Sequence, residues 1–85
     1  MTWIMNYDLA KNLDGLKRYV EQRVPTGSFL RAILENNLKE ACMRADSENI
    51  KVIPIYVSWL FNEAPGICWG SPEKVKDWLA KGPMV

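Results

Sequence analysis

The sequence predicts an all-α fold, a single small domain built as a bundle of about four helices. Apolar residues recur at spacings of three and four in several segments, as they do on the buried face of a helix. Helix caps and helix breakers separate these segments. Residues 53–61 also have strong β-propensity, so a strand is the competing interpretation there. The sequence offers no convincing second strand to pair with it, and we therefore predict a helix.

The first predicted helix covers residues 15–23, with Asp14 as its N-cap. Pro25-Thr26-Gly27 breaks the chain, and a second helix is predicted from residue 27 to residue 44. Asn36-Asn37 is a candidate break inside this second helix, because asparagine favours caps and turns over helix interiors. The apolar positions of the second helix are Phe29, Leu30, Ile33, Leu34, Leu38, Ala41 and Cys42.

The third predicted helix is capped by Asp46 or Ser47 and ends at Ala64-Pro65-Gly66. Pro54 has no backbone N–H and clashes with the preceding turn, so we expect a kink or a fresh helix start close to it. The predicted inward stripe consists of Ile50, Ile53, Val57, Leu60 and Phe61.

The fourth predicted helix has the clearest local pattern, with Ser71 at the N-cap, Pro72 at the first helical position and Glu73 in the first turn. It extends to about residue 81, where Gly82-Pro83 stops it. Its inward-facing residues are predicted to be Val75, Trp78 and Leu79.

The domain organisation follows from these elements. Residues 13–85 form the single helical domain, and residues 1–12 form an N-terminal segment that is unusually apolar for a tail. We expect this segment to dock on its own core or on a neighbouring subunit. Four Trp, three Tyr and two Phe are generous for 85 residues, and together with the apolar segment they predict a homo-oligomer.

Composition excludes several classes of function. The formal charge is +1, from 11 basic and 10 acidic side chains, which argues against a general nucleic-acid binder. The sequence predicts no membrane span and no signal peptide. Cys42 and Cys68 fit a reducing cytoplasm, with a Cys42–Cys68 disulfide as the minor alternative. Cys42, on an apolar face, is expected to behave as a small hydrophobe.

The chain contains no histidine. Ser-His-Asp and Cys-His catalysis and histidine-based metal sites are therefore excluded. We predict a protein that binds without catalysing, with no cofactor and no metal.

Two places in the sequence are candidate ligand sites. The first is the turn before the second helix, where Gly27 and Ser28 offer backbone amides to a phosphate. Arg18, Arg23 and Arg31 would add charge-assisted bonds, and Tyr19 or Phe29 would stack on a ring. The alternative is a tight turn between helices with solvated arginines.

The second candidate is Trp69-Gly70-Ser71, before the fourth helix. Trp69 would stack on a base, while the amides of Gly70 and Ser71 receive phosphate. The alternative is that Trp69 fills the core from a loop and Ser71 only caps the helix.

A set of different short motifs extends along most of the chain, from about residue 15 to residue 81. The motifs are Gly15-Leu16-Lys17-Arg18-Tyr19-Val20-Glu21, Val24-Pro25-Thr26-Gly27-Ser28-Phe29-Leu30, Leu34-Glu35-Asn36-Asn37-Leu38, Arg44-Ala45-Asp46, Asn49, Asn62-Glu63-Ala64-Pro65 and Trp69-Gly70-Ser71-Pro72-Glu73. Together they resemble a family of short proteins carried by tailed phages and prophages, for which no activity is settled. This chain departs from the family pattern at Phe61, where members often have Tyr, and at Arg23, where they tend to have Gly or His.

The resemblance implies a protein of the infected bacterial cytoplasm and favours a role in counter-defence. The leading expectation is that the protein sequesters a nucleotide-derived immune signalling molecule. The alternative is an inhibitor or adaptor that binds a host or phage protein through a helical aromatic face made by Tyr56, Trp59 and Trp78.

Overall fold

A computed structural model describes residue 7 and residues 10–82, and every regular element in that part of the chain is helical. The all-α prediction is confirmed, with five α-helices in the described residues where about four were expected. None of these helices has the length and apolar character needed to cross a membrane. The elements are α1 (Leu13–Gln22), α2 (Ser28–Leu34), α3 (Leu38–Arg44), the 3₁₀ helix η2 (Asn49–Val52), α4 (Ile53–Glu63) and α5 (Pro72–Ala80).

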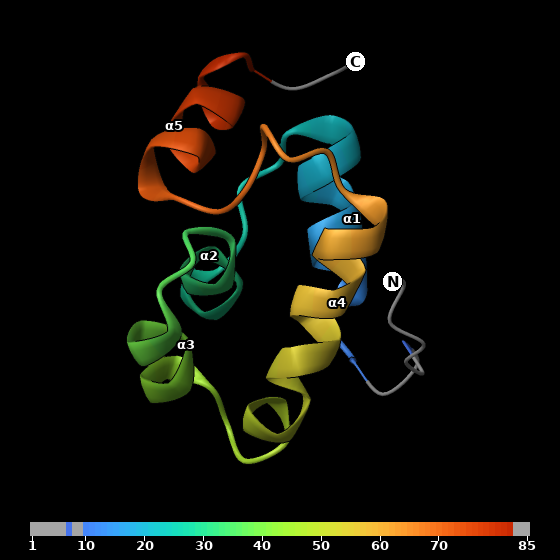
Figure 1. Ribbon diagram of the computed structural model, residues 1–85, viewed down its shortest axis with the longest axis vertical. Coiled ribbons are helices and arrows are strands. Elements are labelled where there is room, and N and C mark those ends of the chain that lie inside the picture. The colour runs from blue at the N-terminus through green and yellow to red at the C-terminus, as the bar shows by residue number, and fades with distance from the viewer. Residues whose placement is uncertain (1–6, 8–9, 83–85) are drawn as a thin grey trace.

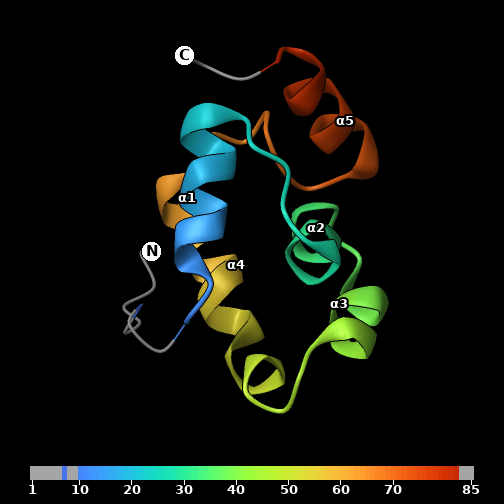
Figure 2. The ribbon, with the colours of Figure 1, turned by 180° about the vertical axis from the view of Figure 1, so that it is seen from behind.

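The helices form two groups. In both ribbon views α1 and α4 lie on one side of the molecule, while α2, α3 and α5 lie on the other (Figures 1 and 2). The loop after α1 crosses from the first group to the second and enters α2 (Figure 2). The described core draws on both groups, and its fully buried side chains include Leu16, Leu34 and Leu60.

The start of α1 differs from the prediction. The helix begins at Leu13, with Asn12 in the N-cap position and no side-chain cap hydrogen bond. Asp14 therefore lies inside the first turn, where its negative charge suits the positive end of the helix dipole. At the other end, Arg23 adopts a left-handed conformation (φ 57°) that closes the helix.

Asn36-Asn37 does break the predicted second helix, and this break accounts for the additional helix. Asn36 adopts a left-handed conformation (φ 60°), which asparagine tolerates better than most residues. The side chain of Asn37 accepts a hydrogen bond from the Glu40 N–H at 3.2 Å and caps α3. The chain thus turns at these two residues and packs α3 against α2.

A new helix starts next to Pro54, as predicted. The short 3₁₀ turn η2 ends at Val52, and α4 begins at Ile53, so Pro54 lies in the first turn, where its missing N–H costs no helical hydrogen bond. A strand at 53–61, the competing interpretation, is wrong.

The predicted inward stripe of this region is wrong at two of its five positions. Ile53 and Leu60 are buried and Val57 is half-buried, but Ile50 is 47% exposed and Phe61 is 63% exposed. Ile50 belongs to η2 and not to the helix, so the helical period does not extend back to it. The α4 residues that complete the buried face are Ile55, Tyr56, Ser58 and Trp59.

The N-terminus of α5 is as predicted. The hydroxyl of Ser71 accepts a hydrogen bond from the Lys74 N–H at 3.2 Å, and Pro72 begins the helix. Val75 and Trp78 are buried, and Leu79 packs partly buried against the core. Gly82, with φ +78°, follows the end of the helix.

Tyr19 joins three parts of the fold. Its hydroxyl donates to the Cys68 carbonyl at 2.7 Å, and its own carbonyl accepts from the Trp78 indole N–H at 2.9 Å. Beside it, the Gly70 N–H donates to the Leu34 carbonyl at 2.7 Å. We call these five residues the Tyr19 seam. Buried hydrogen bonds of this kind fix the loop before α5 onto α1 and α2.

Burial within the Tyr19 seam also affects proton binding. Desolvation raises the pKa of the Tyr19 hydroxyl above its ordinary value, with a further contribution from Cys68. Desolvation likewise raises the pKa of the Cys68 thiol. Both cysteines are free, so the Cys42–Cys68 disulfide alternative is wrong. Cys42 is exposed, which corrects its expected place on an apolar face.

The described part of the N-terminal segment contacts α4 and the core. The hydroxyl of Tyr7 accepts a hydrogen bond from the Asn62 side-chain amide at 3.1 Å, and Ala10 is buried. The backbone N–H of Asn12 donates to the Tyr56 hydroxyl at 3.1 Å. Residues 1–6 and 8–9, which carry most of the predicted docking segment, lie outside the described residues.

Candidate functional site

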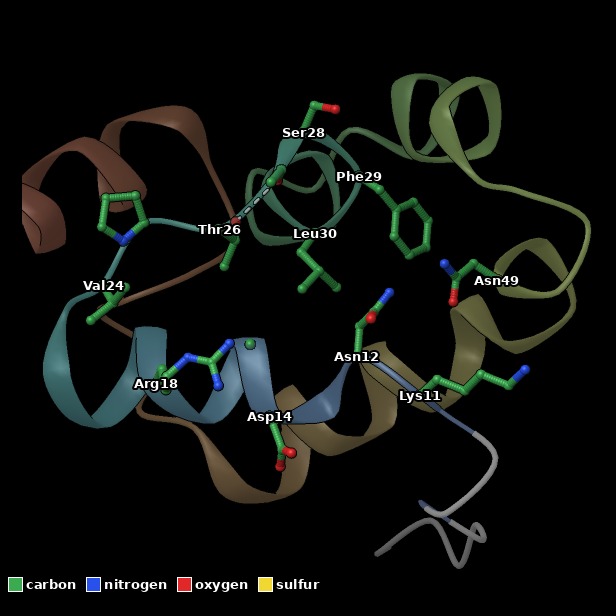
Figure 3. Close-up of a pocket in the computed structure, with 13 residues that line it drawn as sticks. Lys11, Asn12, Asp14, Arg18, Val24, Thr26, Ser28, Phe29, Leu30 and Asn49 are labelled. Carbon is green, nitrogen blue, oxygen red and sulfur yellow. Dashed lines mark hydrogen bonds between the residues drawn. The ribbon is translucent and has the colours of Figure 1, made fainter.

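A surface pocket of about 610 Å³ lies between α1 and the start of α2 (Figure 3). We call it the α1–α2 pocket. Its volume is within the range of small-molecule sites, which is about 300–1,000 Å³. Its lining residues are Lys11, Asn12, Asp14, Gly15, Arg18, Val24, Pro25, Thr26, Gly27, Ser28, Phe29, Leu30 and Asn49.

The charges of the pocket lie on α1 and just before it. Lys11 and Arg18 are cationic, and Asp14 is the only carboxylate among the lining residues that the structure describes. In Figure 3 the Arg18 guanidinium extends along α1 beneath the 24–28 loop, whereas Asp14 points away from that loop. The Arg18 guanidinium makes no hydrogen bond or ion pair within the described residues, so its donors remain available to an anion.

Lys11 is already paired, but weakly. Its Nζ lies 3.5 Å from a carboxylate oxygen of Glu48, and both side chains are about 70% exposed. An ion pair this exposed is screened by water and contributes little to stability. Lys11 can therefore turn toward an anionic ligand at small cost.

The end of the pocket that lies away from Arg18 combines the Phe29 ring with the side-chain amides of Asn12 and Asn49. Phe29 packs against Tyr56 in an edge-to-face arrangement, with ring centroids 5.7 Å apart and an interplanar angle of 77°. The Tyr56 hydroxyl donates to Oδ1 of Asn49 at 3.0 Å and accepts from the Asn12 N–H. Figure 3 shows Phe29, Asn12 and Asn49 together at this end, away from Arg18.

The structure brings together four of the predicted site residues, Arg18, Gly27, Ser28 and Phe29, as lining of one pocket. The helix that begins at Ser28 has only seven residues, so its dipole is a weaker attraction for phosphate than the prediction assumed. In Figure 3 the Ser28 hydroxyl points away from the other labelled side chains.

Three further predicted residues lie elsewhere. Tyr19 is fully buried in the Tyr19 seam, so the expectation that its ring stacks on a ligand is wrong. Arg31 bonds Glu35, the residue that follows α2, with Nε 2.9 Å from the carboxylate oxygen. The Arg23 guanidinium carbon lies 4.8 Å from the centroid of the Trp78 ring, and the buried Nε of Arg23 has no hydrogen-bond partner among the described residues. Neither arginine lines the α1–α2 pocket.

The second candidate site, at residues 69–71, is used internally. Trp69 packs partly buried against the core, as its simpler interpretation held. The Gly70 N–H is taken by the Leu34 carbonyl, and the Ser71 hydroxyl by the Lys74 N–H. The Gly70 amide and the Ser71 hydroxyl are therefore already engaged within the fold.

Sequence reasoning missed several residues of the pocket, above all Asn12 and Asn49. They lie 37 positions apart in the sequence, and the Tyr56 hydroxyl bonds to both of them. Gly15 is the one missed position with a local pattern, because a glycine inside a helix often marks a close approach. A Cβ on Gly15 would lie 3.0 Å from Cδ1 of Leu30, so α2 packs directly on α1 there.

Within residue 7 and residues 10–82, no group of three or more acidic or cysteine side chains is arranged to hold a metal ion. No protein-family model, curated protein or solved structure matches the chain. The function is therefore argued from the pocket itself.

Proposed function

We propose that the protein is a non-enzymatic binder that holds a small anionic ligand with a planar ring in the α1–α2 pocket. A nucleotide-derived molecule has this combination. The observation that carries the proposal is the pairing in one pocket of the Arg18 guanidinium, which has no partner within the described residues, with the Phe29 ring. Arg18 would bind phosphate, and Phe29 would pack against the base.

Two features support binding of a small molecule over a macromolecule. The pocket volume of about 610 Å³ suits a ligand of nucleotide size. The chain as a whole carries a formal charge of only +1, which disfavours a long polyanion. A protein with two cations in one pocket and a formal charge close to zero is suited to bind a small, compact anion.

The biological role we propose is counter-defence by a phage. The protein would sequester a nucleotide-derived immune signal in the infected cell and leave that signal chemically unchanged. This role rests on the resemblance to short phage proteins and on the chemistry of the pocket. A homo-oligomer, in which two subunits close over one ligand, is part of the same proposal. Leu38 and Met43, which are 67% and 68% exposed on α3, are apolar side chains available to such an interface.

The alternative is a protein–protein inhibitor that contacts its partner through an aromatic helical face, and the burial of the residues expected to form that face disfavours it. Tyr56, Trp59 and Trp78 are all buried in the core. The surface of this fold therefore presents little of these three rings to a partner.

A retention experiment tests the proposal. Purified protein is incubated with 5′-nucleoside monophosphates and cyclic dinucleotides, recovered by filtration and denatured, and the released ligand is identified by mass spectrometry. We expect intact ligand. Native mass spectrometry of the same samples measures the subunit number with and without it. Altered ligand would indicate an enzyme, and no retention of any nucleotide would contradict the proposal.

Two arginine variants provide a matched comparison. Arg18→Gln removes the charge in the pocket, whereas Arg31→Gln removes an arginine that pairs with Glu35 outside it. A charge-assisted hydrogen bond contributes about 1.5–3 kcal/mol, so Arg18→Gln should weaken binding by about 10- to 100-fold. Arg31→Gln should leave the affinity within about threefold. Equal losses in both variants would place the ligand elsewhere.

A further inference from the structure

The Asn49 side chain has its amide orientation fixed by its neighbours. The backbone N–H of Asn12 donates to the Tyr56 hydroxyl at 3.1 Å, and a backbone N–H can act only as a donor. In the structure the Tyr56 hydroxyl donates its own proton to Oδ1 of Asn49, 3.0 Å away. Because Oδ1 of Asn49 is engaged in this bond, its NH₂ group points elsewhere.

The NH₂ group of Asn49 faces the ring end of the pocket. Asn49 lines the α1–α2 pocket, and Figure 3 shows its side-chain nitrogen on the Phe29 side and its oxygen on the opposite side. The Asp46 carboxylate accepts from the Asn49 backbone N–H at 2.7 Å and holds this residue in place. Phe29 is fixed in turn by its edge-to-face contact with Tyr56.

We infer that the ring end of the pocket selects a heterocycle with an exocyclic carbonyl, a 6-oxopurine or a 4-oxopyrimidine, over its amino counterpart. This inference rests on the proposed function and specifies its ligand. A base packed against Phe29 presents its edge to Asn49, which offers a donor. A carbonyl oxygen accepts that hydrogen bond, whereas an exocyclic amino group places donor against donor.

The other polar groups at this end do not supply the same selection. The Asn12 side chain also lines the pocket, but within the described residues no hydrogen bond fixes its amide, so it can turn to meet either edge. The Asp14 carboxylate, which would favour an amino group, points away from the 24–28 loop and from Phe29 (Figure 3). Asn49 is therefore the group whose fixed orientation discriminates.

Two pairs of nucleotide probes differ only in the edge of the base that carries the oxo or amino group. Inosine and adenosine 5′-monophosphate differ at position 6, and uridine and cytidine 5′-monophosphate differ at position 4. Affinities are measured by isothermal titration calorimetry. The oxo member of each pair should bind about tenfold more tightly, which corresponds to about 1.4 kcal/mol.

Asn49→Asp should invert the preference. Tyr56 can still donate to one carboxylate oxygen, and the other oxygen then offers only an acceptor to the ligand. Adenosine monophosphate should bind more tightly than inosine monophosphate, although both bind more weakly because of the added negative charge. Asn36→Asp is the control, because it adds the same charge at an exposed residue that does not line this pocket.

Tyr56→Phe supplies a second variant. It removes the hydroxyl that orients Asn49, so the amide can rotate and the ratio of the two affinities should fall toward one. Circular dichroism establishes that this variant is folded before binding is measured. If it does not fold, the Asn49→Asp inversion decides the question alone.

The outcomes separate this inference from the proposed function. Equal binding of inosine and adenosine monophosphate by the natural chain, lost in Arg18→Gln, would overturn the selection by Asn49 and leave the proposed function standing. Retention of the oxo preference in Asn49→Asp would overturn it as well. If none of the four nucleotides binds, both the selection and the proposed function are wrong.

Discussion

Arg18 and Tyr19 are neighbours on α1, but they belong to two regions with opposite chemistry. Tyr19 is fully buried, and its hydroxyl and carbonyl both bond to other parts of the chain. The Arg18 guanidinium is exposed in the α1–α2 pocket and bonds to nothing in the described residues. Consecutive residues point in different directions on a helix, so one element serves both regions.

The difference teaches where stability and binding reside. The polar groups of the Tyr19 seam are satisfied within the fold, so they stabilise it and have nothing left to offer a ligand. In the pocket the contacts of Arg18 and Lys11 with the described residues are weak or absent, so these side chains are available for binding. Substitutions in the two regions should therefore have separable effects.

Trp78→Ala should have the largest effect on stability. It removes a buried indole, the hydrogen bond to the Tyr19 carbonyl, and the packing surface for Arg23 and Lys81. Truncating a buried Trp costs about 3–5 kcal/mol, and a domain of this size is held by about 5–10 kcal/mol. Urea denaturation followed by circular dichroism measures the loss. A loss below about 1 kcal/mol would mean that α5 is not anchored through Trp78.

Tyr19→Phe should have a smaller effect that depends on pH. The variant keeps the ring and leaves the buried Cys68 carbonyl without its donor, which costs about 1–3 kcal/mol. It should not change nucleotide binding, because the hydroxyl does not line the pocket. A loss of binding without a loss of stability would reverse the assignment of the two regions.

The pH dependence has a definite sign. Burial raises the pKa of Tyr19 from its ordinary value of 10.0, so the folded protein keeps a proton that the unfolded chain releases above that pH. The contribution of this group is fully present below pH 10.0 and is lost as the pH rises further. Denaturation between pH 8 and pH 11 should therefore show falling stability at the alkaline end. Tyr19→Phe should reduce this slope and leave the part due to Cys68, whose pKa is also raised.

The fold was predicted best where the relevant chemistry is local. The Ser71 cap, the break at Asn36-Asn37 and the fresh start near Pro54 each depend on a few adjacent residues. The predicted stripe failed at Ile50, because the helical period was extended across the boundary between η2 and α4. It failed also at Phe61, which lies inside α4 but on its exposed face. Packing between helices decides which of several apolar residues are buried, and the spacing of residues in the sequence does not reveal that packing.

The candidate site was predicted only in part for the same reason. Arg18 and Phe29 were found because they flank one turn in the sequence. Arg18 and Tyr19 were assigned to one site, although adjacent helical residues do not share a face. Asn49 joins the pocket through a hydrogen bond to Tyr56, which in turn bonds to the start of α1, 44 residues away. No spacing in the sequence reveals that contact.

Lys11→Gln should have the smallest effect on stability. It tests whether the α1–α2 pocket, in contrast to the Tyr19 seam, can be changed without destabilising the fold. The ion pair that it removes joins Lys11 and Glu48, both largely exposed, so the expected change is at most about 0.5 kcal/mol. Glu48→Gln breaks the same pair from the other side and should change stability equally little. Urea denaturation at low and moderate salt measures both variants. Binding should separate them, because Lys11→Gln removes a cation from the pocket, whereas Glu48→Gln frees that cation for an anionic ligand. A stability loss above about 1 kcal/mol in either variant would mean that the pocket rim helps to hold the fold, and binding could then not be altered independently of folding.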